Sequence, residues 1–288
     1  MRPELSVVIP VRDAAGTIEE QLDALLAQTW DRPWELVVAD NGSRDGTQAI
    51  VERYVAADPR VRLVDASDRP GVAHCRNVGI REARAEAIAM CDADDVVTAG
   101  WLRAMGEGLR VHELVTGPLD VTTLNPEWVL ETRGRAIESG PGQFFGIFEF
   151  AHSCNVGFRR DVVERVGGFD EALVAGEDIE LSGRLLRAGV KVGYLDDAVV
   201  RYRYRTTTRG LWRQARAYGQ VRPELFLRLE RAGIETPRPA TLRSWAFLVR
   251  NVALVAHRPG RARWLWVAAG NVGQLEGRLG VPWAGRVG

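Results

Sequence analysis

The chain has 288 residues, of which 46% are hydrophobic and 26% charged, and its formal net charge at pH 7 is zero. This length supports a sizeable core in one large domain, or in one domain with an appendage. No run of about 18 apolar residues occurs, which excludes a membrane-spanning segment. The N-terminus lacks the pattern of a signal peptide, and Cys75, Cys91 and Cys154 lack metal-ligand spacing. We therefore expect a cytoplasmic protein with reduced thiols.

The charge is divided unevenly along the chain. Residues 201–288 hold 17 Arg and 4 acidic residues, whereas residues 1–200 hold 21 basic and 34 acidic residues. An acidic body with a basic tail indicates two surfaces with different tasks. No nucleic-acid-binding motif accompanies the arginines, so we expect no nucleic acid partner.

Strands and helices alternate over the first ninety residues. Apolar runs at 5–10, 36–39, 61–64 and 87–90 predict buried strands. Helices are expected from Thr17, where Thr17–Glu20 has the form of a capping box, from residue 45, and over 71–85. This alternation predicts an α/β fold with a mostly parallel sheet. Neither a dinucleotide-binding nor a P-loop glycine motif is present, so nucleotide binding would depend on side chains at strand ends.

Three carboxylates follow the fourth apolar run within four residues, namely Asp92, Asp94 and Asp95. Ligands of open α/β sheets bind at the carboxyl ends of the strands. Crowded carboxylates repel one another unless a cation lies among them, and Mg²⁺ and Mn²⁺ prefer oxygen ligands. Taken alone, these residues predict a metal site or, equally well, a solvated acidic turn that caps the next helix.

The second half of the chain is less regular. We expect a helix over 101–109, an irregular segment over 122–150, a strand over 154–158 and a short helix over 160–166. A further helix begins near Glu177 and Asp178, and acidic residues favour a helix N-terminus for reasons of the helix dipole alone. By themselves, these two residues are therefore explained as helix caps.

The basic tail predicts helices over 210–231 and 242–256. In the second helix, Arg or His recurs every seven residues from Arg243 on an otherwise apolar cylinder, and Arg and Trp crowd together over 261–266. This pattern is typical of a membrane interface. It is equally typical of a helix that packs on the body or on a second subunit, and both interpretations stay open.

Five sequence segments occur in an order that resembles the family 2 glycosyltransferases. They are Val7–Arg12, Val37–Thr47, Arg76–Gly79, Asp92–Asp95, and Gly168–Glu171 ahead of Glu177–Asp178. The resemblance covers roughly residues 4–205 and implies a GT-A fold, which is a Rossmann-like α/β architecture with flanking helices. We expect a catalytic, nucleotide-sugar-binding domain over 1–205 and an Arg- and Trp-rich helical extension over 206–288.

The resemblance implies an activity and the residues that bind its donor. A sugar would pass from a nucleotide sugar, most simply a UDP-sugar, to an acceptor hydroxyl. The residues implied to contact the donor are Pro10, Val11, Arg12, Asp40, Asn41, Arg76, Asn77, Asp92 and Ala93. Among them, Asp40 would accept a hydrogen bond from the base, and Arg76 with Asn77 would hold the ribose or the diphosphate.

The resemblance also implies a metal ligand and a general base. Asp94 would reach a divalent metal, Mn²⁺ or Mg²⁺, that bridges the diphosphate and stabilises the leaving group as a Lewis acid. Asp178, with Glu177 as the fallback, would face the acceptor hydroxyl and remove its proton. One displacement with one base would invert the anomeric configuration.

One departure from the family pattern concerns the metal. Many relatives carry a His on the strand after the base helix, where this chain has Arg-Tyr-Arg-Tyr at 201–204. An arginine here, Arg201, could bind the diphosphate directly and share the electrostatic task of the metal. His152 is a spare candidate ligand, and whether the metal is essential stays open.

Two other functions compete with this interpretation. A nucleotidyltransferase would also use carboxylate-bound metal, but residues 11–16 lack the Gly-rich basic loop that it normally carries. A degenerate nucleotide-sugar-binding or membrane-associated scaffold would keep the fold without turnover, although the acidic residues are intact.

The acceptor and the partners are less well defined. The acceptor is expected to be a glycan, a lipid-linked molecule or a small molecule. Residues 241–283 predict a peripheral contact with the inner face of the cell membrane, and the oligomeric state is open.

Overall fold

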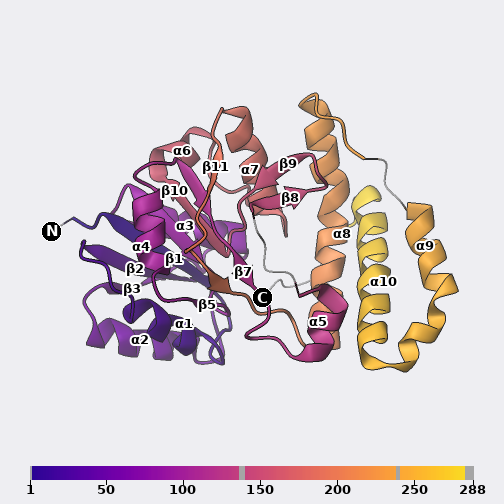
Figure 1. Cartoon of the computed structure of the whole chain (residues 1–288), viewed down its shortest axis with the longest axis horizontal. Helices are drawn as coiled ribbons and strands as arrows, with labels where there is room; N and C mark the ends of the chain where they lie inside the picture. Colours follow the sequence, from indigo (N-terminus) through magenta and orange to yellow (C-terminus); the bar gives the residue numbers. More distant parts are fainter. Residues whose placement is uncertain (1, 136–139, 238–240, 283–288) are drawn as a thin grey trace.

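The computed structural model describes residues 2–135, 140–237 and 241–282, and it shows an α/β body beside a group of C-terminal helices (Figure 1). The strands are β1 (Leu5–Val11), β2 (Trp34–Asp40), β3 (Val61–Asp65), β4 (Ala87–Cys91), β5 (Val96–Val97), β6 (Leu114–Thr116), β7 (Leu119–Asp120), β8 (Gly142–Phe144), β9 (Phe148–Phe150), β10 (Asn155–Arg159), β11 (Val192–Tyr194) and β12 (Val200–Arg201). The helices are α1 (Ile18–Leu26), α2 (Thr47–Ala57), α3 (Val72–Glu82), α4 (Trp101–Gly108), α5 (Glu127–Arg133), α6 (Arg160–Arg165), α7 (Glu177–Arg187), α8 (Thr208–Arg231), α9 (Thr241–Arg250), the 3₁₀ helix η1 (Val252–Ala256) and α10 (Arg258–Arg278).

The central sheet has seven strands in the order β11-β6-β10-β4-β1-β2-β3. Strand β10 runs antiparallel to both of its neighbours, whereas the other neighbouring pairs are parallel. This arrangement confirms the expected α/β class with a mostly parallel sheet. All seven residues of β1 are buried, which explains why this strand reads as a continuous apolar run.

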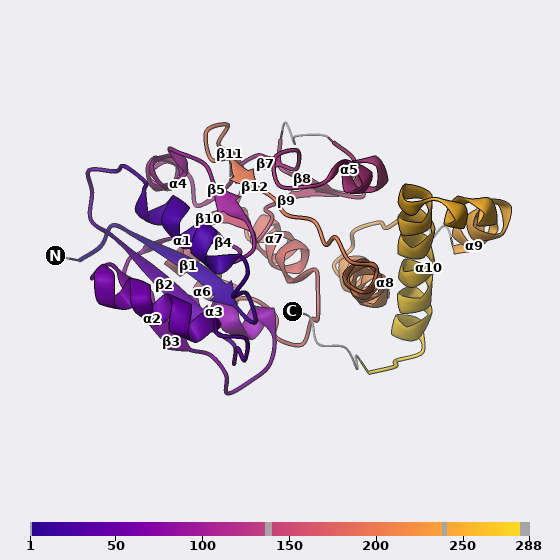
Figure 2. The same ribbon diagram turned by 90° about the horizontal axis from the view of Figure 1, so that it is seen from below.

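Helices cover both faces of the sheet (Figure 2). Alternate residues of β1 point to opposite faces, as the two-residue period of a strand requires. Leu5, Val7 and Ile9 pack with residues of α1, α2 and α4, whereas Val8 packs with residues of α3, α6 and α7. With both faces covered, the carboxyl edge of the parallel strands is where polar side chains can converge on a ligand.

The segment 122–150 was expected to be irregular, and that expectation was wrong. It contains α5 and the hairpin of β8 and β9, while residues 136–139 lie outside the described residues. The buried rings of Phe144, Phe148 and Phe150 pack with residues of α8. These short elements are stabilised by a helix far along the chain, so local sequence patterns do not indicate them.

Two expectations about helix ends were also wrong. Among the described residues, Thr17 makes no side-chain cap hydrogen bond, and Glu20 instead pairs with Arg203 at 2.7 Å. The helix expected over 242–256 is interrupted, since α9 ends at Arg250 and η1 follows. The side-chain amide of Asn251 donates to the carbonyl of Phe247 at 2.9 Å, and such local bonds compete with helical backbone bonds.

The C-terminal helices form a layer of their own, with α8 next to the body and α9 outermost (Figure 2). Helices α8 and α10 approach closely at glycines, because a Cβ atom at Gly219, Gly273 or Gly277 would overlap the backbone of the facing helix. In the described part of the chain, no helix is both long and apolar enough to cross a lipid bilayer. The boundary expected between residues 205 and 206 stays a prediction; α8 begins shortly after it, at Thr208.

We expect Gly273→Ala to lower the free energy of unfolding by about 1–3 kcal/mol, because the added methyl group would overlap the carbonyl of Arg216 on α8. The matched control is Gly270→Ala, where the atom nearest to an added Cβ is the Ala215 oxygen at 3.7 Å. There the higher helix propensity of alanine should leave stability unchanged or raise it by up to about 1 kcal/mol. Urea unfolding measures both variants, and equal effects would contradict the close helix contact.

Candidate active site

The residues expected to bind a donor come from the carboxyl ends of neighbouring strands. Strand β1 lies between β2 and β4, and its last residue, Val11, is paired in register with Asp40 at the end of β2. Asp92 directly follows β4. The segments that leave these three strands therefore emerge side by side, as the sequence predicts.

A pocket of about 390 Å³ opens beside the ends of β1 and β2. Its lining residues are Arg12, Asn41, Gly42, Ser43, Arg44, Ser67 and Pro70. The Asn41 amide donates to the Arg69 carbonyl at 2.7 Å, and its oxygen accepts from the Gly71 N–H at 2.9 Å. Asn41 thus holds the pocket wall in place, and Arg12 and Arg44 give the pocket positive charge suited to an anionic ligand.

Asp40 is buried and is engaged by its own turn. It accepts hydrogen bonds from the Ser43 N–H at 3.1 Å and from Gln48 Nε2 at 2.6 Å. Pro10 and Val11 are buried next to it. Asp40 therefore shapes the turn that lines the pocket, and its contact with a base stays a prediction.

Arg76 lies beneath the site and bridges two carboxylates. Its side chain is 3% exposed, its Nη2 lies 3.0 Å from Asp92 Oδ1, and its Nη1 is paired with Glu177. Burial alone would lower the pKa of Arg76. The charges of Asp92 and Glu177 raise this pKa by more than burial lowers it, so the guanidinium stays charged. Burial raises the pKa of Glu177, and Arg76 opposes this shift. One guanidinium thus ties the end of β4 to the start of α7.

The Asn77 side chain forms hydrogen bonds with the loop at residues 168–171. Its Nδ2 donates to the Phe169 carbonyl and to Glu171 Oε1, both at 2.9 Å, and its Oδ1 accepts from the Phe169 N–H at 2.9 Å. The two residues expected to hold the ribose or the diphosphate, Arg76 and Asn77, therefore direct these hydrogen bonds at the protein. Their observed contacts are those of positioning residues.

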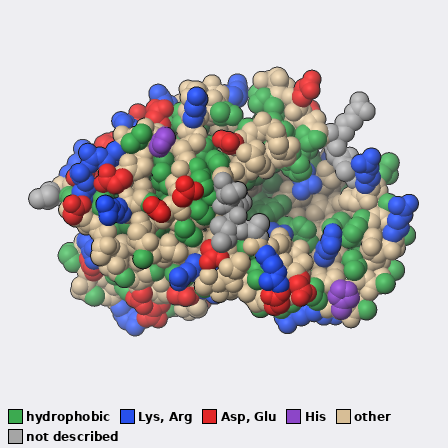
Figure 3. Space-filling model, viewed as in Figure 1, with side chains coloured by type: hydrophobic (Ala, Val, Ile, Leu, Met, Phe, Trp, Pro, Cys, Tyr) green, Lys and Arg blue, Asp and Glu red, His purple; other side chains and the backbone are tan. Residues whose placement is uncertain are grey.

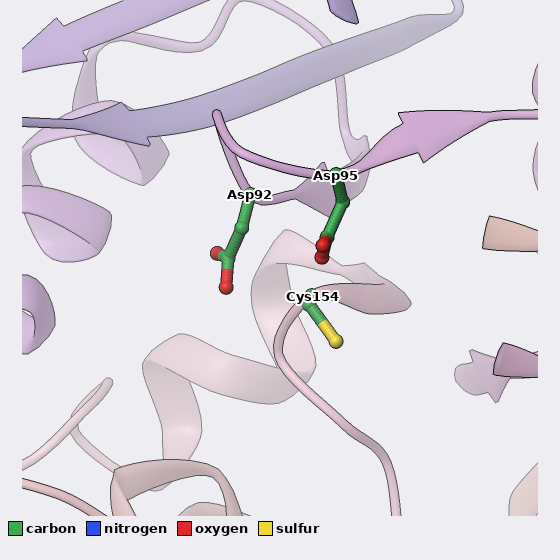
Figure 4. A group of neighbouring side chains, drawn as sticks. All are labelled: Asp92, Asp95 and Cys154. Atoms are coloured by element: carbon green, nitrogen blue, oxygen red, sulfur yellow. The ribbon is translucent and has the colours of Figure 1, made fainter. Parts of the chain in front are cut away.

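Asp92 and Asp95 lie close to Cys154, which precedes β10 (Figure 4). One potential ligand atom of each residue lies within 4.8 Å of the other two. Asp95 is buried; its Oδ1 accepts from the Arg203 N–H at 2.8 Å, but its Oδ2 has no hydrogen-bond partner among the described residues. Burial raises the pKa of Asp95 well above its ordinary value. An orphaned carboxylate oxygen beside a second carboxylate fits a hard divalent cation.

Asp94, the predicted metal ligand, forms an ion pair with Arg205. Its Oδ2 accepts from Arg205 Nη1 at 2.8 Å; burial raises the pKa of Asp94, and Arg205 lowers it. Arg201, expected at the diphosphate, is exposed in β12. Sequence reasoning missed Arg205, although arginine at every second position from 201 to 205 was a signal. The spare ligand candidate, His152, packs edge-on against Phe150 with ring centroids 4.6 Å apart.

The two acidic residues at the start of α7 have different surroundings. Glu177 is buried against Arg76. Asp178 is half-buried, and its Oδ2 accepts from the Ser153 N–H at 3.3 Å. Asp178 Oδ1 also accepts from the Ile179 N–H at 2.8 Å, so part of the capping explanation holds. Of the two carboxylates, Asp178 is the more accessible to a ligand.

The helical extension contributes side chains that face the body. Tyr218 on α8 is 41% exposed, and the pKa of its hydroxyl is raised by partial burial and by the charges of Asp178 and Glu177. The ring of Tyr218 lies edge-on to that of Trp266 on α10, with centroids 6.1 Å apart, and Arg133 of α5 stacks over Trp266. Sequence reasoning assigned this tryptophan only to a membrane or packing surface, because its contacts with Tyr218 and Arg133 cannot be predicted from local patterns.

Comparison with known proteins identifies the class. A family model described as Glycosyl transferase family 2 matches residues 6–167, which is more than half of the chain, and one described as Glycosyl transferase family group 2 matches residues 87–272. The chain belongs to glycosyl transferase family 2 and is a transferase enzyme of that family.

Several curated proteins are similar to the chain over most of its body. Glycosyltransferase AglE of Haloferax volcanii is 29% identical over 203 residues, which cover 68% of this chain and 66% of that protein. Succinoglycan biosynthesis protein ExoO of Rhizobium meliloti is 32% identical over 65% of this chain and 57% of its own length. The chain thus spans about half to two thirds of the length of these relatives.

Solved structures share the whole architecture. The mannosyltransferase PcManGT of Pyrobaculum calidifontis, in complex with GDP-Man and Mn²⁺, matches with a TM-score of 0.62 and 22% identity over 96% of this chain and 88% of that one. Residues 1–349 of TarS from S. aureus, in complex with UDP-GlcNAc, match with a TM-score of 0.56 and 16% identity, covering 96% of this chain and 92% of that one. These neighbours confirm the GT-A fold with its C-terminal helical region.

Proposed function

We propose that the protein is an inverting glycosyltransferase that moves a sugar from a nucleotide sugar, most simply a UDP-sugar, to an acceptor hydroxyl. The observation that carries this proposal is the bridge made by Arg76 between Asp92 and Glu177. It holds the carboxylates after β4 and the neighbouring Asp178 in one rigid unit. A single displacement across the anomeric carbon needs its donor-side and acceptor-side groups fixed in this way.

On the donor side, the pocket beside Arg12 and Asn41 receives the nucleotide, with Asp40 directed at the base. Asp94, together with the neighbouring Asp92 and Asp95, would hold Mn²⁺ or Mg²⁺. When bound, the metal would stabilise the departing diphosphate as a Lewis acid. Support for this assignment comes from the unpartnered, buried Oδ2 of Asp95.

Arginines supply further positive charge near the diphosphate. Arg205 already neutralises Asp94 at 2.8 Å, so its guanidinium is placed to bind the leaving group as well. Arg201 is exposed on the preceding strand and stays the second candidate.

On the acceptor side, Asp178 removes the proton of the attacking hydroxyl. Its neighbour Glu177 is occupied by Arg76, which favours Asp178 over the fallback. Removal of the proton in the transition state raises the nucleophilicity of the oxygen at the moment when the bond to the diphosphate breaks.

The acceptor is a glycan or a lipid-linked molecule, with a small molecule as the alternative. The enzyme would bind it in the cytoplasm, at the inner face of the membrane. The surface is hollowed between the body and the helical extension, and this hollow is the candidate acceptor site (Figure 3). Tyr218 and Trp266 stand on the extension with their rings in contact. Large amphipathic rings of this kind offer an apolar face and a polar edge to a sugar.

Thermal unfolding with UDP, GDP, dTDP and NAD, each with and without Mn²⁺, tests the donor proposal. A ligand present at 100 times its dissociation constant stabilises the folded state by about 2.7 kcal/mol. For a chain of this size we expect UDP to raise the unfolding midpoint by about 5–10 °C, and Mn²⁺ to increase that rise. Asp94→Asn should remove the Mn²⁺-dependent part, whereas Asp161→Asn, on the exposed side of α6, should keep it.

The outcomes separate the competing functions. A UDP-induced rise that ignores Mn²⁺ but is lost in Arg205→Gln would assign the electrostatic task of the metal to Arg205. No rise with any nucleotide would contradict the proposed function and favour a scaffold that has lost its donor.

A further inference from the structure

We propose that the outer face of α9 and η1 docks on an anionic lipid bilayer. This face, called the α9–η1 face below, consists of Leu242, Arg243, Trp245, Val249, Arg250, Val252 and Val255. The proposal deepens the membrane location proposed above, and its test does not depend on sugar transfer.

The apolar side chains of the α9–η1 face are exposed to different extents. Leu242 is 87% exposed, Val249 77% and Val252 59%, whereas Trp245 is 41% and Val255 38% exposed. Leu242, Trp245 and Val249 follow one another at intervals of three and four residues, so they form one stripe along α9. Exposed residues of this size in one contiguous stripe mark an interaction surface.

The opposite side of α9 packs on α10. Leu248 is buried there, and its carbonyl accepts a hydrogen bond from Trp264 Nε1 at 3.0 Å. Ser244 donates to Asn271 Oδ1 of α10 at 2.8 Å. Helix α9 is therefore anchored on α10 by one face, whereas Leu242 and Val249 on its other face stay largely exposed.

The charge around this stripe points to the chemistry of the partner. Arg243 and Arg250 lie seven residues apart on the same side of α9, and both are exposed. No acidic residue occurs in the sequence between Glu235 and Glu276. Figure 3 shows basic and apolar side chains interspersed along the edge of the molecule where Figure 1 places α9. An apolar stripe flanked by arginine, in a segment without acidic residues from 236 to 275, matches the interface of an anionic bilayer.

A second copy of the chain is a poorer occupant of the same face. A symmetric dimer would bring the face against itself. Arg243 and Arg250 would then meet the same arginines of the other copy, with no carboxylate from residues 236–275 to compensate. Like charges facing one another across an interface oppose association, whereas anionic headgroups would neutralise them.

The test is flotation of the full chain with phosphatidylcholine vesicles that contain or lack phosphatidylglycerol. We expect binding to the anionic vesicles at low salt that weakens as salt is added, because mobile ions screen the attraction of the arginines. Val249→Glu should weaken the partition coefficient about tenfold or more, since a valine expected to enter the bilayer interface is replaced by a charge of the wrong sign. Arg243→Gln with Arg250→Gln should weaken it by about fivefold for each arginine.

The matched control is Val111→Glu. Val111 is 79% exposed, compared with 77% for Val249, but it lies after α4 on the far side of the body (Figure 1). This variant should bind vesicles like the wild type. Equal loss in Val111→Glu and Val249→Glu, or binding that ignores phosphatidylglycerol, would overturn the proposal. So would a lipid-free dimer in light scattering that Val249→Glu dissociates.

The result stays separate from that of the donor proposal. Thermal unfolding with UDP should give the same rise for Val249→Glu as for the wild type, because α9 lies outside the donor pocket. Loss of vesicle binding with an intact UDP response therefore concerns the docking face alone.

Discussion

Asp178→Asn is expected to lower kcat for sugar transfer by about 10²–10⁴-fold while the dissociation constant of the nucleotide stays unchanged. The amide has almost the shape of the carboxylate but cannot accept the proton of the acceptor hydroxyl. Its oxygen can keep the bond from the Ser153 N–H, so the local structure should survive. Release of the nucleoside diphosphate with an acceptor measures turnover, and calorimetry with UDP measures binding.

The control for this substitution is Asp161→Asn. Asp161 is the second residue of α6 as Asp178 is the second residue of α7, so both substitutions remove a carboxylate from the first turn of a helix. If the role of Asp178 were helix stabilisation alone, the two variants would lose comparable, small amounts of stability and neither would lose turnover. Full activity in Asp178→Asn would move the base assignment to Glu177.

The strands and the carboxylate cluster could be predicted because their causes are local. Buried parallel strands such as β1 and β4 read as continuous apolar runs, and ligands of such sheets bind at the strand ends. Asp92, Asp94 and Asp95 follow one of these ends directly. Their clustering therefore needs no knowledge of distant contacts.

The partners of these residues could not be predicted because they depend on contacts between distant segments. Arg76 and Glu177 lie 101 positions apart, and Arg205 and Asp94 lie 111 apart. Arginine at 201, 203 and 205 offers three candidates for one cluster. Which of them reaches the Asp94 carboxylate is decided by where the chain leaves β12, a strand of 2 residues stabilised by pairing with β5 and β7.

Arg76→Gln is expected to lower the free energy of unfolding by about 3–5 kcal/mol, the usual cost of removing one partner of a buried ion pair. The substitution would leave the carboxylates of Asp92 and the buried Glu177 without the guanidinium that now contacts both. For a chain of this size the unfolding midpoint should fall by about 10 °C. Adding Glu177→Gln removes one of the two carboxylates that have lost their partner, so the double variant should be more stable than Arg76→Gln alone.

Arg62→Gln provides the matched comparison, because Arg62 also bridges two glutamates, Glu35 at 3.1 Å and Glu82 at 3.5 Å. The side chain of Arg62 is 24% exposed, and Glu35 keeps hydrogen bonds from Ser6 and from the Arg84 N–H when the guanidinium is removed. Water can also reach Glu82, so we expect Arg62→Gln to lower the free energy of unfolding by only about 1 kcal/mol. Urea unfolding of Arg76→Gln and Arg62→Gln measures both losses of stability. Equal losses would mean that burial of the Arg76 bridge adds nothing to stability. The link between β4 and α7 would then no longer support the proposed position of Asp178 opposite the donor.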